Sequence, residues 1–592
     1  MRILGISALA GVEAFLREHF PVEMAQQPRV MQGMDAAAAL IGDGQVVAAA
    51  SQERFDRIKK SPAFPFQAID YCLAADGLGF DQIDAVCFNF DFGRYKRVYD
   101  GHDIAQSYWR RCLSPAAIRE RLASRYGRVP PVQHIQHHTS HIHAALASFR
   151  GGRALGIVMD AAGEIDATTV YLLEDGGVQR IGRYPIVQSL GLCYSLVTHF
   201  LGYAFNEDEY KVMALASFGD PARYAKFFEN AIHLQPGGKI EIPLLSVNRT
   251  FADRLFFSES LHRIREGLGF DGTQRPIDDR HRDVSAALQR RFTQALFHIC
   301  RHFAEETHAR ELILSGGCAE NCAAIGELRT SGLFDHIHVA YASGDEGTAL
   351  GAAAAYSAAH GKPILMPDRM PFFGPAPRLD SVRTAVARQA DGLRIETFAS
   401  TEQMLDEAAA EVAQKKIIAL CDGRMEFGAR ALGNRSLLAL PSDPAMKDRI
   451  NLAIKKRQSY RPFAPAVTVE DAHHYFYLAP GESYPYMTML TRVREDFVQK
   501  LPAIVHVDKT ARVQTVSRTN NPMFHYFLTR LKMQTGMPIV LNTSYNVNHQ
   551  PIVCSEEDAV ETFRFMDINS LYIAQSRVYR VPADEVEQNR PS

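Results

Sequence analysis

Two histidines one helical turn apart are the first residues of this chain whose spacing points to chemistry. His137 and His141 stand at positions i and i+4 of the run Gln136–His141, and on a helix this puts both imidazoles on one face, within reach of one metal ion. Asp160, after an apolar run, and Asp345, in a glycine-flanked loop, could each add a carboxylate. Solvated or helix-capping histidines are the alternative, because the spacing also arises by chance.

A double glycine after the apolar run 312–315 marks a second candidate site. Gly316 and Gly317 carry no side chain, so a phosphate or nucleoside can approach the backbone there. Asn321 follows one turn later. An ordinary strand-to-helix turn has the same signature, so the glycine pair is informative only together with its neighbours.

The C-terminal third carries arginines set against Phe, Pro and Gly rather than among other polar residues. A guanidinium in such surroundings is costly without an anion, so the pattern favours binding of a phosphate-sized dianion. A salt-bridged domain, with these arginines paired to nearby acidic residues, is the competing interpretation. Together with small polar residues after the apolar run 538–540, the candidates are Arg430, Arg435, Arg457, Arg461, Arg512, Asn542 and Ser544.

The elements that must position these residues include a repeat. An apolar strand, a turn-rich acidic segment and two apolar runs joined by a tight turn occur at 3–48 and again at 155–178. Asp-Gly and Gly-Gly turns between apolar runs predict β-hairpins. The repetition predicts a duplicated α/β fold, and by fold analogy an actin-like or sugar-kinase-like nucleotide-binding domain.

Prolines divide the chain into two domains. Those between 363 and 377 exclude a helix, because each removes a backbone donor and fixes φ. We predict an N-terminal domain over 1–362, a linker over 363–394 and a second α/β domain over 395–592.

Length, charge and cysteine usage limit the class of protein. A chain of 592 residues is too long for one core, and a formal net charge of −2 excludes a general electrostatic grip on nucleic acid. Nine cysteines without a CxxC pair predict reduced core thiols. Met1 leads directly into an apolar strand-like run, and no apolar stretch reaches the length of a bilayer span. These features predict a cytoplasmic protein with no membrane partner.

Nearly end to end, the chain resembles the ATP-dependent O-carbamoyltransferases of antibiotic, toxin and nodulation-factor pathways. The longest strings that carry the resemblance lie in the C-terminal third. The strings are DAAAAL at 35–40, ERF at 53–55 with Arg57 and Lys59, the His137/His141 pair, EYKVM at 209–213, Gly344-Asp345, FGARALGNRS at 427–436, RPFAP at 461–465, HVDKTARVQT at 506–515 and LNTSYNV at 541–547.

The resemblance implies a fold and a reaction. The N-terminal domain would be actin-like, of the Kae1-like kind, and the C-terminal domain YrdC-like. The C-terminal domain would convert carbamoyl phosphate and ATP, supplied with Mg²⁺, into a carbamoyl-adenylate. The N-terminal domain would then transfer the carbamoyl group to a hydroxyl of a small natural-product acceptor and release AMP.

The resemblance also implies roles for individual residues. His137, His141, Asp160 and Asp345 match the metal ligands, with iron(II) or another divalent ion as the cofactor. The matches for nucleotide binding are Lys59, Glu209, Lys211, Gly316, Gly317 and Asn321, and those for carbamoyl phosphate are the seven C-terminal residues named above. Asp35 and Lys59 match catalytic positions.

One departure touches the chemistry directly. Family members carry His-Asp-Ser-Ala-Ala near the N-terminus, and that His is the expected base for the acceptor hydroxyl. Here Met34 precedes Asp35, and methionine cannot accept a proton. The chain also has an insertion over 11–31. We hypothesise that His19 or a nearby carboxylate in this insertion replaces the base; a solvated helix without a catalytic part is the alternative.

Other functions stay open at this point. The same activation chemistry could serve an amine or another nucleophile, which needs less help from a base. A regulatory nucleotide-binding protein would not need the arginine set, and a tRNA-modifying enzyme is disfavoured by the near-neutral charge. The sequence does not identify the acceptor, nor does it decide between a monomer and a homodimer.

Overall fold

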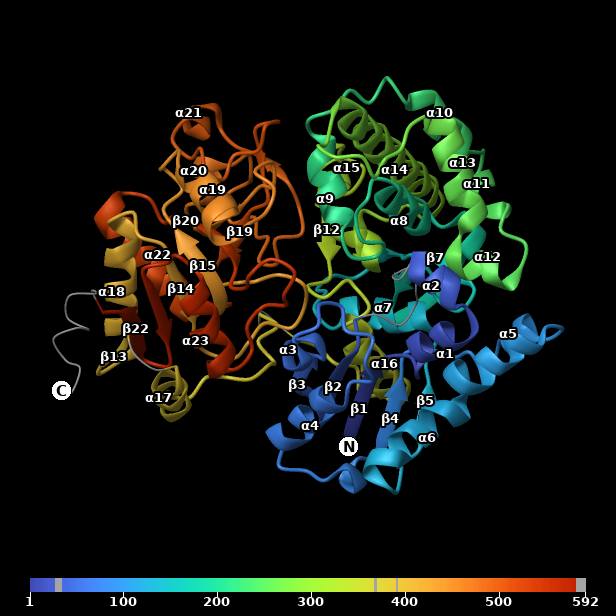
Figure 1. Ribbon diagram of the computed structural model, residues 1–592, viewed down its shortest axis with the longest axis horizontal. Coiled ribbons are helices and arrows are strands. Elements are labelled where there is room, and N and C mark those ends of the chain that lie inside the picture. The colour runs from blue at the N-terminus through green and yellow to red at the C-terminus, as the bar shows by residue number, and fades with distance from the viewer. Residues whose placement is uncertain (27–34, 367–369, 390–391, 582–592) are drawn as a thin grey trace. The chain divides into compact units, whose positions relative to one another are not determined.

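A computed structural model describes residues 1–26, 35–366, 370–389 and 392–581 of this chain (Figure 1). Met34 and the last part of the insertion over 11–31 lie outside the described residues. The chain forms two compact units. The N-terminal unit comprises Met1–Gln52 and Lys60–Pro367, and the C-terminal unit comprises Glu53–Lys59 and Asp368–Ser592.

The N-terminal unit begins with a five-stranded mixed sheet of order β3-β2-β1-β4-β5. The hairpin of β2 (Ala37–Gly42) and β3 (Gln45–Ser51) lies antiparallel to the central strand β1 (Arg2–Ser7). On the other side of β1, β4 (Ala85–Phe88) and β5 (Val132–His134) run parallel to it. Both residues of the Asp43-Gly44 turn have positive φ, 49° and 80°, as a two-residue hairpin turn requires.

A second sheet repeats this arrangement with the order β12-β11-β6-β7-β8. The hairpin of β7 (Asp166–Glu174) and β8 (Gly177–Pro185) is antiparallel to β6 (Ala154–Met159). The strands β11 (Glu311–Ser315) and β12 (His336–Val339) run parallel to β6. The two sheets share strand order and direction, which confirms the predicted duplicated α/β fold and both predicted hairpins.

Two helices join the sheets. Helix α7 (His137–Leu146) packs on β6 and β11, helix α16 (Gly347–Ala359) packs on β1 and β2, and the two helices pack on each other. They approach so closely at Gly351 that a Cβ there would lie 1.7 Å from the carbonyl oxygen of Ser140. Glycine at position 351 therefore allows the contact that brings the start of α7 toward the start of α16.

The remaining elements of the N-terminal unit include the helices of the insertion. Phe15 and Leu16 are buried, so α1 is a packed amphipathic helix. These elements are α1 (Val12–His19), α2 (Pro21–Gln26), α4 (Phe66–Ala75), α5 (Asp103–Tyr108), α6 (Pro115–Tyr126), α8 (Leu190–Phe200), α9 (Glu209–Ala216), α10 (Ala225–Ala231), α11 (Pro243–Ser246), α12 (Phe251–Phe256), α13 (Ser258–Leu268), α14 (Asp279–Thr307), α15 (Cys322–Thr330), β9 (His233–Leu234) and β10 (Ile240–Glu241).

The C-terminal unit is built on an eight-stranded mixed sheet of order β13-β22-β21-β14-β15-β20-β16-β19. Alternate residues of β14 face opposite cores: Ala419 lies in one buried cluster, and Ile418 and Leu420 lie in another. The strands are β13 (Leu393–Thr397), β14 (Ile418–Cys421), β15 (Arg435–Ala439), β16 (Ala464–Thr468), β19 (Gln514–Val516), β20 (Ile539–Ser544), β21 (Ser570–Ile573) and β22 (Ser576–Arg580), with a separate pair β17 (Thr491–Arg492) and β18 (Thr510–Ala511).

Helices cover both faces of this sheet. Helices α18 (Thr401–Ala413) and α22 (Pro522–Thr535) contribute to one core, and α17 (Leu379–Arg388) and α23 (Glu556–Phe565) contribute to the other. Short helices complete the unit: α3 (Glu53–Asp56), α19 (Met446–Asp448), α20 (Ala472–Tyr475) and α21 (Glu495–Val498). The unit is a three-layer α/β domain. Its predicted YrdC-like identity stays a prediction.

The segment predicted as a linker is partly regular structure. Helix α17 and the start of β13 lie within 363–394, and Val382 and Ala385 of α17 are buried in the C-terminal core. The prolines end at Pro377, so they exclude a helix only up to that residue. The amphipathic sequence beyond them folds against the sheet.

The segment Glu53–Lys59 leaves the N-terminal unit and belongs to the C-terminal one. Its arginines bond to backbone carbonyls there: the Arg54 guanidinium donates to Gly428 O at 3.0 Å and that of Arg57 to Ile552 O at 2.7 Å. In the described part of the chain, no helix combines the length and the apolar character that crossing a bilayer needs.

Candidate active site and metal centre

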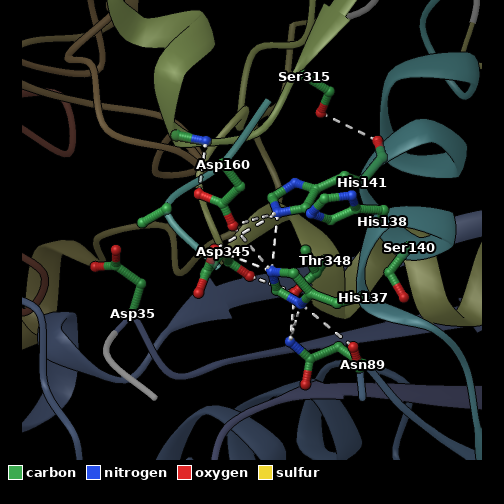
Figure 2. Close-up of polar contacts among 12 residues, drawn as sticks. Asp35, Asn89, His137, His138, Ser140, His141, Asp160, Ser315, Asp345 and Thr348 are labelled. Carbon is green, nitrogen blue, oxygen red and sulfur yellow. Dashed lines mark hydrogen bonds and ion pairs between the residues drawn. The ribbon is translucent and has the colours of Figure 1, made fainter. Parts of the chain in front are cut away.

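The two histidines and two aspartates singled out by their sequence spacing converge at one point of the N-terminal unit (Figure 2). His137 and His141 face it from the first turns of α7, Asp160 from the end of β6, and Asp345 from the loop before α16. His137 Nε2 lies 3.1 Å from His141 Nε2, 3.2 Å from Asp160 Oδ2 and 3.4 Å from Asp345 Oδ1. His141 Nε2 lies 3.5 Å from each carboxylate.

These distances suit a divalent ion. Nitrogen and oxygen ligands bind first-row metals at about 2.0–2.2 Å, so ligand atoms around one tetrahedral ion lie about 3.4 Å apart. All four ligand atoms of the group lie within 4.8 Å of one another, and three of the four residues are buried. Two imidazoles and two carboxylates form a mixed N/O donor set typical of iron, zinc or manganese.

The electrostatics of the group also attract positive charge. Burial alone would lower the pKa of His137, but the carboxylates of Asp345 and Asp160 outweigh it and raise that pKa to about 10. Burial would raise the pKa of Asp160, and the two histidines instead hold it well below its usual value. The group binds cationic charge at its centre, either as protons or as a metal ion.

A third histidine of the same run plays a different part. His138 is buried, and its Nδ1 lies 3.0 Å from Thr169 Oγ1. Burial, with the charges of His137 and His141, lowers the pKa of His138 to about 3, so its ring is neutral. Although it is adjacent in sequence to His137, it contacts Thr169 of β7 and is not one of the four candidate ligands.

Asp35 precedes β2 and is labelled in the same close-up as the metal group (Figure 2). Its Oδ2 accepts a hydrogen bond from Lys60 Nζ at 2.8 Å. Glu346 is also near this ion pair: burial first, and then the charges of Asp35 and Glu320, raise its pKa well above the usual value. The predicted Lys59 belongs instead to the segment of the C-terminal unit, so its neighbour Lys60 is the lysine at this place in the N-terminal unit.

The double glycine lies against the metal group. Gly316 has φ 88°, and a Cβ there would lie 2.3 Å from Met159 O, so only glycine fits. Gly317 N donates to Asp160 Oδ1 at 3.3 Å, which connects the glycine turn to a candidate ligand. Asn321 caps α15 by accepting from Ala324 N at 3.1 Å.

Glu209 and Lys211, predicted to bind nucleotide, lie at the start of α9. Glu209 Oε1 accepts from Asn206 N at 2.7 Å, and burial raises the pKa of this carboxyl while Ser195 and Lys60 oppose the shift. Lys211 is buried and pairs with Asp208 at 2.8 Å.

His19 is engaged within its own helix. Its Nδ1 lies 3.0 Å from Phe15 O, and its ring stacks on the Phe15 ring at a centroid distance of 4.1 Å. Its Nε2 lies 3.9 Å from Glu18. These contacts are those of a packed helix end, and they provide no support for a role of His19 as a base.

In the C-terminal unit, a cationic cluster forms at the predicted anion pocket. Burial, followed by the charges of Arg457 and Arg461, holds the pKa of Lys455 well below its usual value. Lys455 Nζ donates to Asn546 O at 2.9 Å and to Asn546 Oδ1 at 2.8 Å. Asn451 supports both arginines: its Oδ1 accepts from Arg457 Nε at 2.7 Å, and its Nδ2 donates to Arg461 O at 3.0 Å.

The other predicted pocket residues of this unit have defined surroundings. The positive charge of Arg512 helps burial to lower the pKa of His506 to about 4. Asn542 is buried and donates to Gln514 Oε1 at 2.8 Å, and Ser544 Oγ donates to Asn546 Oδ1 at 2.6 Å. Arg430 is half-buried.

Arg435 differs from the other predicted pocket arginines. It is fully buried, and its guanidinium donates to four backbone carbonyls, those of Pro375, Asp422, Gly423 and Asn434. These bonds satisfy carbonyl groups at the end of β14 and its neighbours. These contacts give Arg435 a structural role, and its predicted part in binding carbamoyl phosphate stays a prediction.

Four residues at these sites were missing from the predicted sets. Lys455 and Lys60 lie close in sequence to predicted residues. That proximity was the sequence feature that could have identified them. Asn451 and Asn89 carried no local motif, because their roles depend on contacts between distant segments. Asn89 lies beside His137 (Figure 2).

The fold and the two sites describe a two-unit α/β protein with a candidate metal centre in one unit and a cluster of basic side chains in the other. Comparison with protein families matches residues 31–354 to the N-terminus and residues 409–580 to the C-terminus of the carbamoyltransferases. The chain belongs to the carbamoyltransferase family, and it is a carbamoyltransferase enzyme.

Individual relatives agree with this family. Nodulation protein NolNO of Sinorhizobium fredii is 36% identical over 94% of this chain and 80% of its own length. The 3'-hydroxymethylcephem-O-carbamoyltransferase of Amycolatopsis lactamdurans is 28% identical over 89% of this chain and 94% of its own. A solved structure, component A of (R)-2-hydroxyglutaryl-CoA dehydratase from Acidaminococcus fermentans, has 14% identity and a TM-score of 0.31 over 60% of this chain and 97% of its own, too weak to carry an argument.

Proposed function

We propose that this carbamoyltransferase depends on ATP and works in two steps. The C-terminal unit converts carbamoyl phosphate and MgATP into a carbamoyl-adenylate. The N-terminal unit transfers the carbamoyl group to a hydroxyl of a small natural-product acceptor and releases AMP. The observation that carries the proposal is that one carbamoyltransferase chain holds two different groups, a cluster of basic side chains around the buried Lys455 and a His/Asp group suited to a metal ion.

The cationic cluster supports the first step. Carbamoyl phosphate, ATP and water together give carbamoyl-adenylate, pyrophosphate and phosphate, and every reactant except water is an anion. Lys455 is buried, and the positive charges of Arg457 and Arg461 act on it, so an anion bound at this group would be stabilised by charged donors. Arg512 follows strand β18, and its positive charge helps to lower the pKa of His506. We assign Arg512 to binding of the same carbamoyl phosphate anion.

The His/Asp group supports the second step. A bound divalent ion, iron(II) by resemblance, would supply Lewis acidity that polarises the carbamoyl oxygen. His137, His141, Asp160 and Asp345 would hold that ion. The Gly316-Gly317 turn bonds to Asp160 through Gly317 N, and Gly317 is exposed, so we propose that the turn binds the nucleotide at Gly317.

Attack by the acceptor hydroxyl breaks the mixed anhydride, and the hydroxyl proton must pass to a base. In our proposal Asp35 takes this proton in place of the histidine that Met34 replaces. Lys60 orients the Asp35 carboxylate through a 2.8 Å bond, and the charge of that carboxylate acts on Glu346, the neighbour of Asp345 in the sequence. The name of the cephem relative, an O-carbamoyltransferase, supports a hydroxyl acceptor.

An amine acceptor is the second candidate, and Met34 favours it. A neutral amine attacks without losing a proton first, so it depends less on a base than a hydroxyl does. The two candidates differ in product, a carbamate ester against a urea.

The test incubates the enzyme with carbamoyl phosphate, MgATP and matched acceptors that differ only in a hydroxyl or an amine. Mass spectrometry follows pyrophosphate, AMP and the carbamoylated product. We expect pyrophosphate only when carbamoyl phosphate is present, and a carbamate ester from the alcohol. Absence of both pyrophosphate and AMP would contradict the adenylate route, and urea formation alone would replace the hydroxyl by the amine.

A further inference from the structure

Asn89 is a buried junction between the first sheet and the candidate metal ligands. It follows the end of β4 and is fully buried. Its Nδ2 donates to Ser7 Oγ at 3.0 Å, at the end of β1, and to Thr348 Oγ1 at 2.8 Å, in the first turn of α16. Its Oδ1 accepts from Ala8 N at 3.4 Å. One amide therefore connects three elements.

The backbone of the same residue faces His137. Asn89 O lies 3.3 Å from His137 Nδ1, and Asn89 Nδ2 lies 3.5 Å from it. Both hydrogens of Nδ2 are directed to the two hydroxyls, so Nδ2 has none left for the imidazole. His137 Nδ1 therefore carries a hydrogen and donates it to the Asn89 carbonyl. This leaves Nε2 as the ligand atom, facing the other three ligands.

Thr348 extends the junction to a second ligand. Its Oγ1 donates its single hydrogen to the carbonyl oxygen of Asp345, and so it must accept from Asn89. This fixes the orientation of the Asn89 amide. Through Thr348, the amide connects the backbone of Asp345 with the carbonyl that holds His137 (Figure 2).

We propose that Asn89, acting through Thr348, is a positioning residue that holds His137 and Asp345 in register for metal binding. The inference rests on the proposed function, because it assumes that these residues bind a metal. Outer contacts of this kind fix the tautomer and the ring orientation of a ligand, and losing one typically weakens metal binding about 10–100-fold.

The clearest variant is Thr348→Val, which keeps the shape of the side chain and removes the hydroxyl. We expect Co²⁺ affinity, measured by chelator competition, to fall about 10–100-fold, with a changed visible spectrum of the Co²⁺ form. Thr348→Ser restores the hydroxyl, so it should bind within about threefold of wild type. Asn89→Ala should resemble Thr348→Val if it folds.

Thr198→Val is the matched control. Thr198 is buried in α8 of the same unit, and its hydroxyl has no hydrogen-bond partner among the described residues. It should leave Co²⁺ affinity unchanged, and urea unfolding of metal-free protein separates general stability from metal binding.

The outcomes separate the inference from the function on which it rests. Wild-type Co²⁺ affinity and spectrum in Thr348→Val would overturn the positioning role alone and leave the proposed metal site intact. A wild-type protein that binds neither Co²⁺ nor Fe²⁺ would overturn the metal site and the positioning role together, whereas pyrophosphate formation in the C-terminal unit would be unaffected.

Discussion

His137 and His141 direct their Nε2 atoms at one point from successive turns of α7, 3.1 Å apart. Two neutral imidazole nitrogens at this distance either share a proton or share a metal ion. Asp160 and Asp345 add negative charge at the same point, so the site requires a cation.

The first prediction concerns His141→Ala. The substitution removes one of four ligand atoms, so metal affinity should fall by about 100-fold or more. This loss is larger than the one expected when a residue that only positions a ligand is changed. Metal content after purification and chelator competition measure this. His143→Gln, on the same helix but outside the ligand group, is the control; equal metal content in both variants would contradict the assignment.

The second prediction concerns Arg512→Ala. Removing this guanidinium should slow carbamoyl-adenylate formation about 100-fold or more, since it removes a charged donor from the proposed anion site. The metal content should stay that of wild type, because the metal ligands belong to the other unit. Pyrophosphate release with carbamoyl phosphate present is the assay. Normal release would exclude Arg512 from the anion site.

The third prediction concerns stability. Arg435→Met removes the guanidinium bonds to four backbone carbonyls, of which those of Pro375 and Asn434 keep a backbone N–H donor, so the C-terminal unit should lose about 3 kcal/mol of unfolding free energy. Urea unfolding measures this loss. Arg512→Ala serves as the comparison, with a much smaller loss expected. If Arg435→Met is as stable as wild type but cannot form the adenylate, the result would support the predicted role of Arg435 in binding carbamoyl phosphate.

The fourth prediction concerns pH. Burial lowers the pKa of His338 to about 4, below the ordinary value of 6.5. The unfolded chain therefore binds the proton first, and stability is lost as pH falls from about 6.5 toward 4. Between pH 7 and pH 5 this loss is about 2 kcal/mol.

Unfolding at both pH values tests this contribution. His338→Asn should show a smaller difference between pH 7 and pH 5 than wild type. His336→Asn, at an exposed position on the same strand, is the control. An unchanged pH dependence in His338→Asn would show that His338 is not buried as a neutral ring.

Much of the fold was readable from local patterns. The Asp43-Gly44 and Asp175-Gly176 turns lie between apolar runs, and hairpin geometry depends on these few adjacent residues. The prolines gave no sign of helix α17 within the predicted linker, because prolines report only on their own positions. Its helix is stabilised by burial of Val382 and Ala385, which the local sequence does not show.

The ligand set shows the same limit. Spacing alone paired His137 with His141, since both lie on one helix, and family resemblance added the two aspartates. Neither spacing nor family resemblance could distinguish the contacts of Arg435 from those of the other arginines. A guanidinium that binds carbonyls and one that binds phosphate can have the same sequence environment.

By itself, the sequence determined the duplicated α/β architecture, the histidine pair and the family, since these rest on short-range periodicity and on contiguous strings. Only the tertiary structure showed that Lys60 pairs with Asp35, that the Arg435 guanidinium donates to backbone carbonyls, and that Asn89 connects His137 with Asp345 through Thr348. Those contacts join residues far apart in the chain, and their geometry depends on how sheets and helices pack.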